Sequence, residues 1–439
     1  MIDLTGKRLL ILGGSRISIE IIKKAREKRI FTVVTDWYDH DKSPAKKVAD
    51  KSYQVSTTDM DGLLDIIKKE NIDGILTGFT DSVLPHYAKL CELAGLPCYG
   101  TEELFELFID KKKYKEKLRE FDIPVVEEYN YTLDQIIKNE NIDLKYPLFV
   151  KPSDGSGSRG VSICRNREQL IEGYKNAQSF SENEDVLIER YIEGKEATLF
   201  FLFDQGKAYL SGLGNRHVRN SQGRDILALP VAYTFPSVLI PDYMENIMPK
   251  MKSMFENVQI ENGMMFAQCL IEDDECIVYD IGYRLTGSLE YYLQESISGY
   301  NPLEMMIDFA LTGDMFANTS RDVEITPYWN SYGYNISFLM KTGLTIETIE
   351  GINTILEYPD VIEAVLAHPE GDSLDESEKG MLKQIMLRVF GKADSIENMK
   401  KSLDDIYRLL TVKDVDGTNV LLPGLEIVEV DGNILEECD

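Results

Sequence analysis

Residues 146–164 read YPLFVKPSDGSGSRGVSIC, and this stretch decides how the fold is interpreted. An apolar run ends at Lys151, and a loop of small residues from Asp154 to Gly160 leads into a second apolar run. Two strands joined by a flexible loop that is rich in backbone N–H groups, with a lysine at its root, are suited to bind a polyphosphate. Glycines let such a loop approach phosphate oxygens because they tolerate positive φ. No Gly-Lys-Ser/Thr opens a helix here, so this is not a Walker loop, and the segment alone also fits an ordinary hairpin with a polar tip.

Further motifs flank this segment in a definite order. Asp110-Lys111 stands upstream, before a helical pattern, and VLIERYIEGKE follows at residues 186–196. FAQC at 266–269 and YDIGYR at 279–284 then flank an acidic turn. In this combination the chain resembles the ATP-grasp superfamily, the ligases that join a carboxylic acid to an amine through an acyl phosphate. The resemblance covers the chain from Gly13-Gly14 to about residue 420, and it is strongest to carbamoyl phosphate synthase large-chain halves, biotin carboxylases and purine-pathway ligases.

Composition limits the class of protein. The 439 residues are enough for two or three domains with a substantial core. The 47 basic and 75 acidic side chains give a formal charge of −28, which repels nucleic acid and anionic lipid, so neither is expected as a partner. The six cysteines form no C-x-x-C pair or zinc spacing. No signal peptide opens the chain and no apolar run approaches roughly 18 residues, so we expect a soluble cytoplasmic protein.

The first 107 residues alternate between strands and helices. Strands are expected at 8–12, 31–36 and 74–76, and helices at 17–29, 63–70 and 84–94. This alternation predicts a parallel sheet covered by helices. Gly13-Gly14 directly after the first strand indicates a turn that faces a ligand. The dinucleotide fingerprint is missing, because the chain reads GGSRIS, and Asp36 is more readily explained as a strand-end residue than as a ribose ligand, so an NAD-dependent oxidoreductase is the least favoured alternative.

The resemblance implies a combined α/β and α+β fold in three parts. Residues 1–107 would form an open parallel sheet, the pre-ATP-grasp domain. Residues 108–320 would form the ATP-grasp domain of two subdomains, with a lid at about 120–190, and residues 321–439 a small C-terminal α+β domain. The chain has no internal repeat, so we expect one ATP-grasp unit and not the doubled unit of a carbamoyl phosphate synthase large chain. A homodimer is suggested by fold analogy alone.

The resemblance also assigns nucleotide-binding residues. Two lysines match the basic residues that contact phosphate, and a lysine can follow phosphate as it moves from nucleotide to acyl group. The loop at 154–160 would close as a lid that excludes water. The segment at 189–192 matches the hinge whose backbone reads the adenine edge, and Glu196 matches the acid that holds the ribose. The expected ATP-binding residues are Lys111, Lys151, Ser156, Gly157, Ser158, Gly160, Glu189, Arg190, Tyr191, Ile192 and Glu196. Two alternatives stay open: Lys112 could replace Lys111, and 193–195 could be a plain hairpin turn.

The metal site departs from the family pattern. The family places a Glu on one strand and, twelve positions later, a second Glu followed by x-Asn-x-Arg; this chain has Gln268, Asp280, Gly282 and Arg284. Mg²⁺ or Mn²⁺ prefers hard oxygen ligands. Asp280 is therefore the expected metal ligand, and Gln268 can add a neutral carbonyl oxygen. A weakened site would favour the second alternative, a nucleotide-binding regulatory protein without turnover.

Two arginines are the expected catalytic residues. Arg284 keeps the family spacing and would hold the substrate carboxylate or the acyl phosphate. Arg216 falls where related chains place a basic residue that faces phosphate or substrate, although a solvated strand end fits it equally well. The predicted reaction is phosphorylation of a small carboxylic acid by ATP, followed by attack of an amine or ammonia, with positioning and charge neutralisation supplying most of the rate. Biotin carboxylase activity is disfavoured, because Leu285-Thr286-Gly287-Ser288 stands where that family has Gln-Val-Glu-His.

Overall fold

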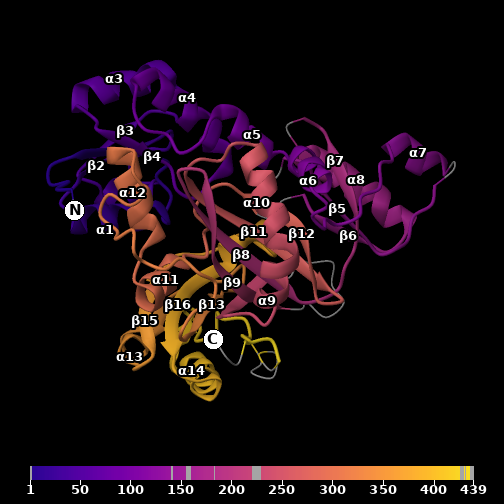
Figure 1. Ribbon diagram of the computed structural model, residues 1–439. Coiled ribbons are helices and arrows are strands. Elements are labelled where there is room, and N and C mark those ends of the chain that lie inside the picture. Colours follow the sequence, from indigo (N-terminus) through magenta and orange to yellow (C-terminus); the bar gives the residue numbers. More distant parts are fainter. Residues whose placement is uncertain are drawn as a thin grey trace.

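A computed structural model describes residues 2–139, 142–154, 160–181, 183–219, 229–425, 430 and 432–435. Its N-terminal part is a parallel sheet covered by helices (Figure 1). The strands are β1 (Arg8–Leu12), β2 (Phe31–Asp36), β3 (Lys51–Gln54) and β4 (Gly74–Leu76), and they pair in the order β3-β2-β1-β4. The helices are α1 (Ser18–Glu27), α2 (Pro44–Val48), α3 (Met60–Glu70), η1 (Asp81–Val83), α4 (Leu84–Ala94) and α5 (Glu102–Ile109).

The expected open parallel sheet is confirmed, including the strands at 8–12, 31–36 and 74–76. Strand β3 was not predicted, because KSYQ lies at the sheet edge without a buried residue and so lacks an apolar pattern. The strand order reverses direction at β1, which pairs with β2 on one side and with β4 on the other. In open parallel sheets the crevice beyond such a switch point is the usual ligand site.

A second, smaller sheet lies in a lobe at the right of Figure 1. It is antiparallel in the order β6-β5-β7. Helix α6 (Lys111–Glu120) precedes it, and its elements are α7 (Leu133–Lys138), β5 (Leu148–Pro152), β6 (Ser162–Cys164), α8 (Arg167–Phe180) and β7 (Val186–Arg190). Helix α8 packs on this sheet around Leu148, Val150 and Leu170, a hydrophobic cluster separate from the main core. The lobe therefore has its own small core.

The largest sheet has eight strands in the order β12-β11-β8-β9-β10-β13-β16-β15, with all its neighbours antiparallel. Its strands are β8 (Glu196–Asp204), β9 (Lys207–Arg219), β10 (Leu229–Phe235), β11 (Gly263–Glu272), β12 (Glu275–Gly282), β13 (Tyr332–Leu339), β15 (Val361–Leu366) and β16 (Ile385–Ala393). Helical elements between them are α9 (Ile240–Asp242), η2 (Tyr243–Ile247), α10 (Met248–Asn257), α11 (Tyr291–Ser298) and α12 (Pro302–Thr312). The sheet continues past residue 320, and the three-part domain division stays a prediction.

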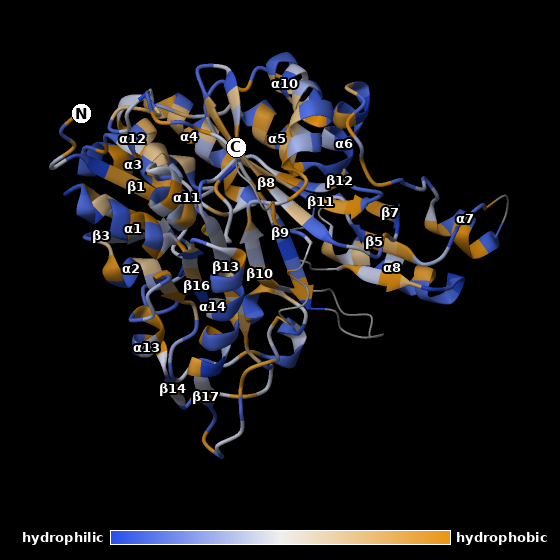
Figure 2. Ribbon diagram, turned by 60° about the horizontal axis from the view of Figure 1, so that its bottom comes forward, coloured by the Kyte–Doolittle hydropathy of each residue, from blue (hydrophilic) through white to orange (hydrophobic). Residues whose placement is uncertain are grey.

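The C-terminal region adds β14 (Thr348–Glu350), α13 (Ile352–Leu356), η3 (Glu376–Glu378), η4 (Leu382–Gln384), α14 (Ile396–Leu409) and β17 (Thr411–Lys413). Helix α14 begins after Ser395, whose side chain accepts a hydrogen bond from the Asn398 N–H. It covers a second hydrophobic core around Phe338, Met399 and Ile406. Figure 2 shows hydrophobic colour on strand β1 and mixed colour on helices such as α7 and α13, which turn one side to solvent. Within the described ranges, no helix combines the length and the apolar character needed to cross a membrane.

Candidate active site

One large cavity, about 1540 Å³ in volume, opens where the N-terminal sheet, the small lobe and the largest sheet meet. Residues that follow β1 and β4, such as Arg16, Phe79 and Asp81, line it, as the switch point in the N-terminal sheet leads one to expect. The volume exceeds the roughly 300–1,000 Å³ of a pocket for a single small ligand, so there is room for more than one molecule. All but one of the predicted site residues in the described ranges border it: Lys111, Lys151, Glu189, Arg190, Tyr191, Ile192, Glu196, Arg216, Gln268, Asp280 and Arg284.

Buried lysines gather at the end of the cavity nearest the small lobe. The Lys151 side chain is 7% exposed, and its Nζ lies 2.9 Å from Glu189 Oε1 and donates to the Tyr279 carbonyl at 3.3 Å. Lys115, fully buried on helix α6, contacts the same carboxylate of Glu189. Burial, together with the charges of Lys115 and Lys111, lowers the pKa of Lys151 to about 8 against the opposing charge of Glu189. Lys151 and Lys115 thus share the Glu189 carboxylate, and with Lys111 nearby this end of the cavity is suited to bind an anion.

Glu189 itself is held by these lysines. Burial alone would raise its pKa, but the charges of Lys151 and Lys115 keep the pKa below the usual value for a glutamate. The side chain is therefore an ionised bridge between two strands and a helix. We predicted Lys151 and Glu189 from the sequence and missed Lys115. It lies four residues after Lys111 on the same helix, and this spacing was the signal available.

Lys111 borders the cavity, whereas Lys112 does not. The Lys111 Nζ lies 3.9 Å from Asp280 Oδ1. Lys112 donates instead to Asp185 Oδ2 at 2.7 Å on the outside of the lobe. Asp110 caps helix α6 by accepting hydrogen bonds from the N–H groups of Lys112 and Lys113. This cap fixes the start of the helix at Lys111.

The predicted adenine hinge forms one wall of the cavity. Arg190 borders the cavity and forms a bidentate ion pair with Glu272, at 2.7 and 2.6 Å. The Tyr191 N–H donates to the Pro147 carbonyl at 3.3 Å, whereas no hydrogen-bond partner of the Ile192 N–H is found within the described part of the chain. Apolar side chains that sequence reasoning did not single out complete this wall: Val126, Phe149, Ile163 and Leu270. A flat, apolar ligand fits against this wall if its edge carries one acceptor for the Ile192 N–H.

Glu196 and Arg216 neutralise each other on the floor of the cavity. Arg216 Nη1 contacts Glu196 Oε2, and the same oxygen accepts from the Tyr279 hydroxyl at 2.9 Å. Arg216 Nε donates to the Tyr233 hydroxyl at 3.2 Å. Burial by itself would lower the pKa of Arg216, but Glu196 holds it above the usual range. Both predicted residues thus face the cavity as an ion pair.

The two predicted metal ligands are direct neighbours. Gln268 on β11 pairs with Asp280 on β12 and, on its other side, with Thr198 on β8, so the three stand in one row. Directly opposed residues of antiparallel strands point to the same face. Asp280 Oδ1 accepts from the Tyr114 hydroxyl at 3.4 Å, and the Thr198 hydroxyl is buried without a partner among the described residues.

Asp280 and Gln268 fit Mg²⁺ only if a bound molecule supplies further oxygen ligands. Across the described residues, no three His, Cys, Asp or Glu side chains gather as a metal site. Asp280 and Gln268 offer two hard oxygen atoms, and Mg²⁺ commonly takes one or two carboxylates and fills its octahedron with phosphate oxygens and water. At Gly282, where the family has Asn, a Cβ atom would lie 2.4 Å from Phe266 Cε1. The aromatic ring therefore occupies the space of the missing ligand.

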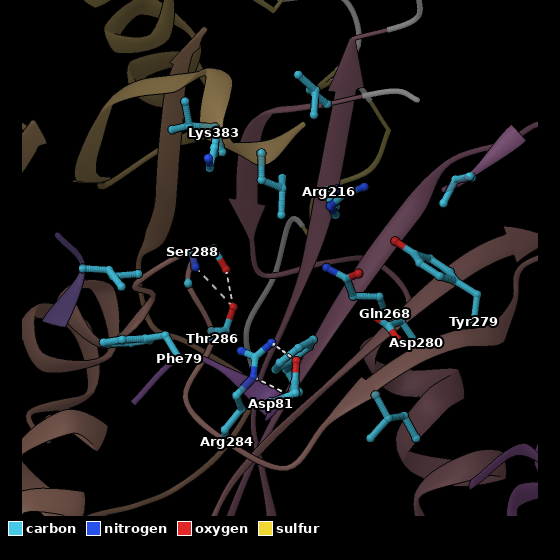
Figure 3. Close-up of a pocket in the computed structure, with 18 of the residues that line it drawn as sticks. Phe79, Asp81, Arg216, Gln268, Tyr279, Asp280, Arg284, Thr286, Ser288 and Lys383 are labelled. Atoms are coloured by element: carbon cyan, nitrogen blue, oxygen red, sulfur yellow. Dashed lines mark hydrogen bonds and ion pairs between the residues drawn. The ribbon is translucent and has the colours of Figure 1, made fainter. Parts of the chain in front are cut away.

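Arg284 is also paired. It forms a bidentate ion pair with Asp81 of the N-terminal part, with Nε–Oδ1 at 2.6 Å and Nη2–Oδ2 at 2.8 Å, and it lies over the Phe266 ring. Figure 3 shows this pair on one side of the cavity, with Lys383 on the opposite side and Arg216 between them. Asp81 was missed because nothing in residues 77–81 marks it. Arg284 is thus paired with a carboxylate of the chain itself, and its contact with the substrate carboxylate or the acyl phosphate stays a prediction.

Other predicted positions lie elsewhere. Gly160 does not border the cavity; it adopts φ +71°, and a Cβ there would approach Phe180 to 2.8 Å. Ser156, Gly157 and Ser158 lie outside the described residues. Asp36 accepts from the N–H groups of Gly14 and Tyr38, at 2.7 and 2.8 Å. It is thus a strand-end residue that fixes the glycine turn and not a lining residue of the cavity.

Comparison with known proteins adds to this geometry. Residues 144–289 match the model of the ATP-grasp domain. The 2-oxoglutarate carboxylase small subunit of Hydrogenobacter thermophilus is 26% identical over 73% of this chain and 70% of its own length. A formate-dependent phosphoribosylglycinamide formyltransferase of Sulfurisphaera tokodaii is 29% identical over 46% of this chain and 51% of its own length. The pyruvate carboxylase of Staphylococcus aureus is much longer, and the chain spans 30% of it.

Solved structures share the fold. The L-amino acid ligase from Bacillus licheniformis superposes with a TM-score of 0.74 over 93% of this chain and 98% of that protein, at 18% sequence identity. The biotin carboxylase domain of the Hydrogenobacter thermophilus 2-oxoglutarate carboxylase, solved with MgADP and bicarbonate, has a TM-score of 0.73 over 93% of this chain and 91% of that domain, at 19% identity.

Proposed function

Since this chain carries an ATP-grasp domain homologous to biotin carboxylase and to carbamoyl phosphate synthase large chains, we propose that it is an ATP-dependent carbon–nitrogen ligase. It activates a small carboxylic acid as an acyl phosphate and joins it to an amine or to ammonia, releasing ADP and phosphate. One observation carries the proposal: Lys151, Lys111 and Asp280 converge at one end of a cavity that is too large for a single ligand.

The nucleotide fits along the wall of the small lobe. Its adenine lies in the apolar slot between Phe149, Ile163 and Leu270, with the Ile192 N–H as donor to the ring. The triphosphate extends towards Lys151 and Lys111. Asp280 and Gln268 would hold Mg²⁺, which would supply positive charge to neutralise the phosphates. Glu196, whose charge is balanced by Arg216, accepts hydrogen bonds from the ribose hydroxyls.

Chemistry then proceeds by positioning and charge. A carboxylate oxygen of the acid attacks the γ-phosphorus, the bond to the β–γ bridging oxygen breaks, and ADP leaves. Lys151, held at 2.9 Å from Glu189, can follow the transferred phosphoryl group with its charge. The amine nitrogen next attacks the acyl carbon and loses a proton, while the carbon–oxygen bond to phosphate breaks. Exclusion of water from the cavity would limit hydrolysis of the acyl phosphate.

A second function is favoured by the reduced donor set at the metal row. Gln268 brings no charge, and Gly282 is blocked by Phe266. A protein that binds the nucleotide and does not turn it over would need no stronger metal site. Such a nucleotide-binding regulatory protein would show ATP binding without ADP release.

Incubation with ATP, Mg²⁺ and pooled carboxylic acids and amines tests the proposal, with ADP as the readout. We expect ADP release that requires both an acid and an amine or ammonia, and that is lost in Asp280→Asn. Calorimetry of ATP binding separates the alternatives: binding without ADP release across the pool supports the regulatory protein, and the absence of both rejects the nucleotide site.

A further inference from the structure

Five arginines border the cavity, among them Arg216, Arg284 and Arg388, and the charges of these three are compensated differently. Arg216 is paired with Glu196, and Arg284 is paired with Asp81. Arg388 on β16 is 9% exposed and borders the same cavity, yet no carboxylate of the described residues forms an ion pair with it. The hydrogen bond recorded for its guanidinium is donated to the neutral Ser337 hydroxyl, at 2.8 Å.

A buried guanidinium without a counter-ion is costly, because taking a charge out of water is repaid only by a partner anion and hydrogen bonds. Glu290 is the acid whose field reaches Arg388, but burial raises the pKa of Glu290 to about 7, so this carboxyl is partly protonated at neutral pH. Burial likewise lowers the pKa of Arg388 below the usual value of an arginine. Its remaining donors are therefore suited to bind a ligand anion.

The anion held there is not the triphosphate. Asp280 and Gln268 stand on the two strands at one edge of the largest sheet, whereas Arg388 is on the strand next to the other edge, five strands away from Gln268. At about 4.8 Å per strand, this is a path of roughly 24 Å along the sheet.

The surroundings of Arg388 are apolar. Val365 on β15 is its direct cross-strand partner and points to the same face, into the cavity. Leu289, Leu382 and Ile385 border the same cavity. Polar contacts come from the Thr286 and Ser288 hydroxyls, which lie 2.7 Å apart and are labelled in Figure 3. This end therefore combines the buried Arg388 guanidinium with an apolar wall, and Lys383, which is paired with Glu378, borders the same cavity.

We propose that Arg388 anchors the carboxylate of an α-amino acid with an apolar side chain, which is the amine component of the reaction. The inference rests on the proposed ligase function and names one of its substrates. The amino acid carboxylate binds Arg388, its side chain packs on Val365 and Leu289, and its amino group points towards the phosphate-binding end. There the nitrogen attacks the acyl phosphate, the bond from carbon to the phosphate oxygen breaks, and the nitrogen loses one proton.

Binding of matched probes to the intact protein tests this without any substitution. The probes are L-leucine, leucinamide and L-aspartate, titrated calorimetrically in the presence of Mg²⁺ and a non-hydrolysable ATP analogue. A charge-assisted hydrogen bond corresponds to about a 10- to 100-fold difference in affinity. We expect leucinamide, which lacks only the carboxylate, to bind 10- to 100-fold more weakly than L-leucine, and L-aspartate to bind more weakly than L-leucine because its side chain is charged.

Variants assign the effect to Arg388. Arg388→Met should weaken L-leucine binding about 10- to 100-fold and leave leucinamide binding and ATP-analogue binding unchanged, and Arg388→Lys should restore part of the loss. Arg321→Met serves as control, since Arg321 pairs with Asp204 and Asp314 away from the cavity. Equal binding of L-leucine and leucinamide would overturn the inference even if ADP release is observed. ADP release that never occurs would reject the ligase function, whichever probe binds.

Discussion

The two ends of the cavity manage charge in opposite ways. At the proposed phosphate-binding end Lys151, Lys115 and Glu189 share their charges in a buried network. At the far end Arg388 has one neutral hydrogen bond and an apolar neighbour in Val365. A network of this kind holds its lysines in place before any ligand arrives, whereas an uncompensated cation makes the ligand itself the partner. From this difference we infer that the first end holds its lysines in fixed positions, and that the second end selects a substrate.

The largest effect is expected when Lys115, the centre of the buried network, is replaced. Lys115→Met leaves Glu189 and Glu128 without the ammonium that contacts both, the latter at 3.0 Å. Loss of one member of a buried ion pair costs about 3–5 kcal/mol, so we expect the free energy of unfolding to fall by this amount in urea denaturation. Lys117→Met on the same helix removes a partly exposed pair with Glu120 and should change it by less than about 1 kcal/mol. Equal stability of the two variants would mean that the network does not order this end.

The metal row gives the next largest effect. Asp280→Asn keeps the shape of the side chain and removes its charge, and loss of one preorganised electrostatic contact lowers kcat by about 10²- to 10³-fold. We expect this loss in steady-state ADP release, with ATP binding weakened to a smaller degree. Asp185→Asn is the matched control, because Asp185 pairs with Lys112 on the outside of the lobe. A variant as active as the control would place the metal elsewhere.

The sequence singled out residues at the lysine-rich end of the cavity and none of those around Arg388, and the reason is local. Lys151 follows an apolar run beside a glycine-rich loop, and Asp280 stands in the second strand of a hairpin with an acidic turn, so each motif carries a recognisable local pattern. Arg388 stands in IMLRVFGKA, where a single arginine in an apolar strand carries no such signal. Only the order of the eight strands brings it to the cavity. The pairing of Arg284 with Asp81 joins residues 203 positions apart and is equally invisible in the sequence.

The surroundings of Arg388 can be tested by the pH dependence of stability, because Glu290 titrates there. Burial raises the pKa of Glu290 from 4.5 to about 7, with Arg388 opposing the shift. Because the folded state binds its proton more tightly than the unfolded state, the stability that this proton confers is present below pH 4.5 and is lost as pH rises to about 7. The loss amounts to about 3 kcal/mol at 1.36 kcal/mol per pKa unit.

Glu290→Gln should remove this loss. We expect the variant to gain about 3 kcal/mol relative to the parent protein between pH 4.5 and pH 8, measured by urea denaturation at each pH. Glu275→Gln, at an exposed position on β12, is the control. If both variants follow the parent across this range, Glu290 is ionised in the folded protein. Arg388 would then have a compensating charge, and the contrast between the two ends would weaken.

The smallest expected effect concerns two adjacent lysines that the sequence alone could not separate. Lys111 lies 3.9 Å from Asp280 at the cavity, and Lys112 pairs with Asp185 outside it. One charge-assisted contact to phosphate corresponds to about 10- to 100-fold in affinity, so Lys111→Met should weaken ATP binding by this factor in calorimetry. Lys112→Met, with the same loss of charge one residue away, should leave ATP binding within about twofold. An equal loss of ATP affinity in both variants would point to long-range attraction by the basic start of the helix. Added salt would suppress this attraction, because exposed charges are screened. A loss confined to Lys111→Met that persists in salt requires a direct contact, and it would therefore fix the direction in which the triphosphate runs along the cavity.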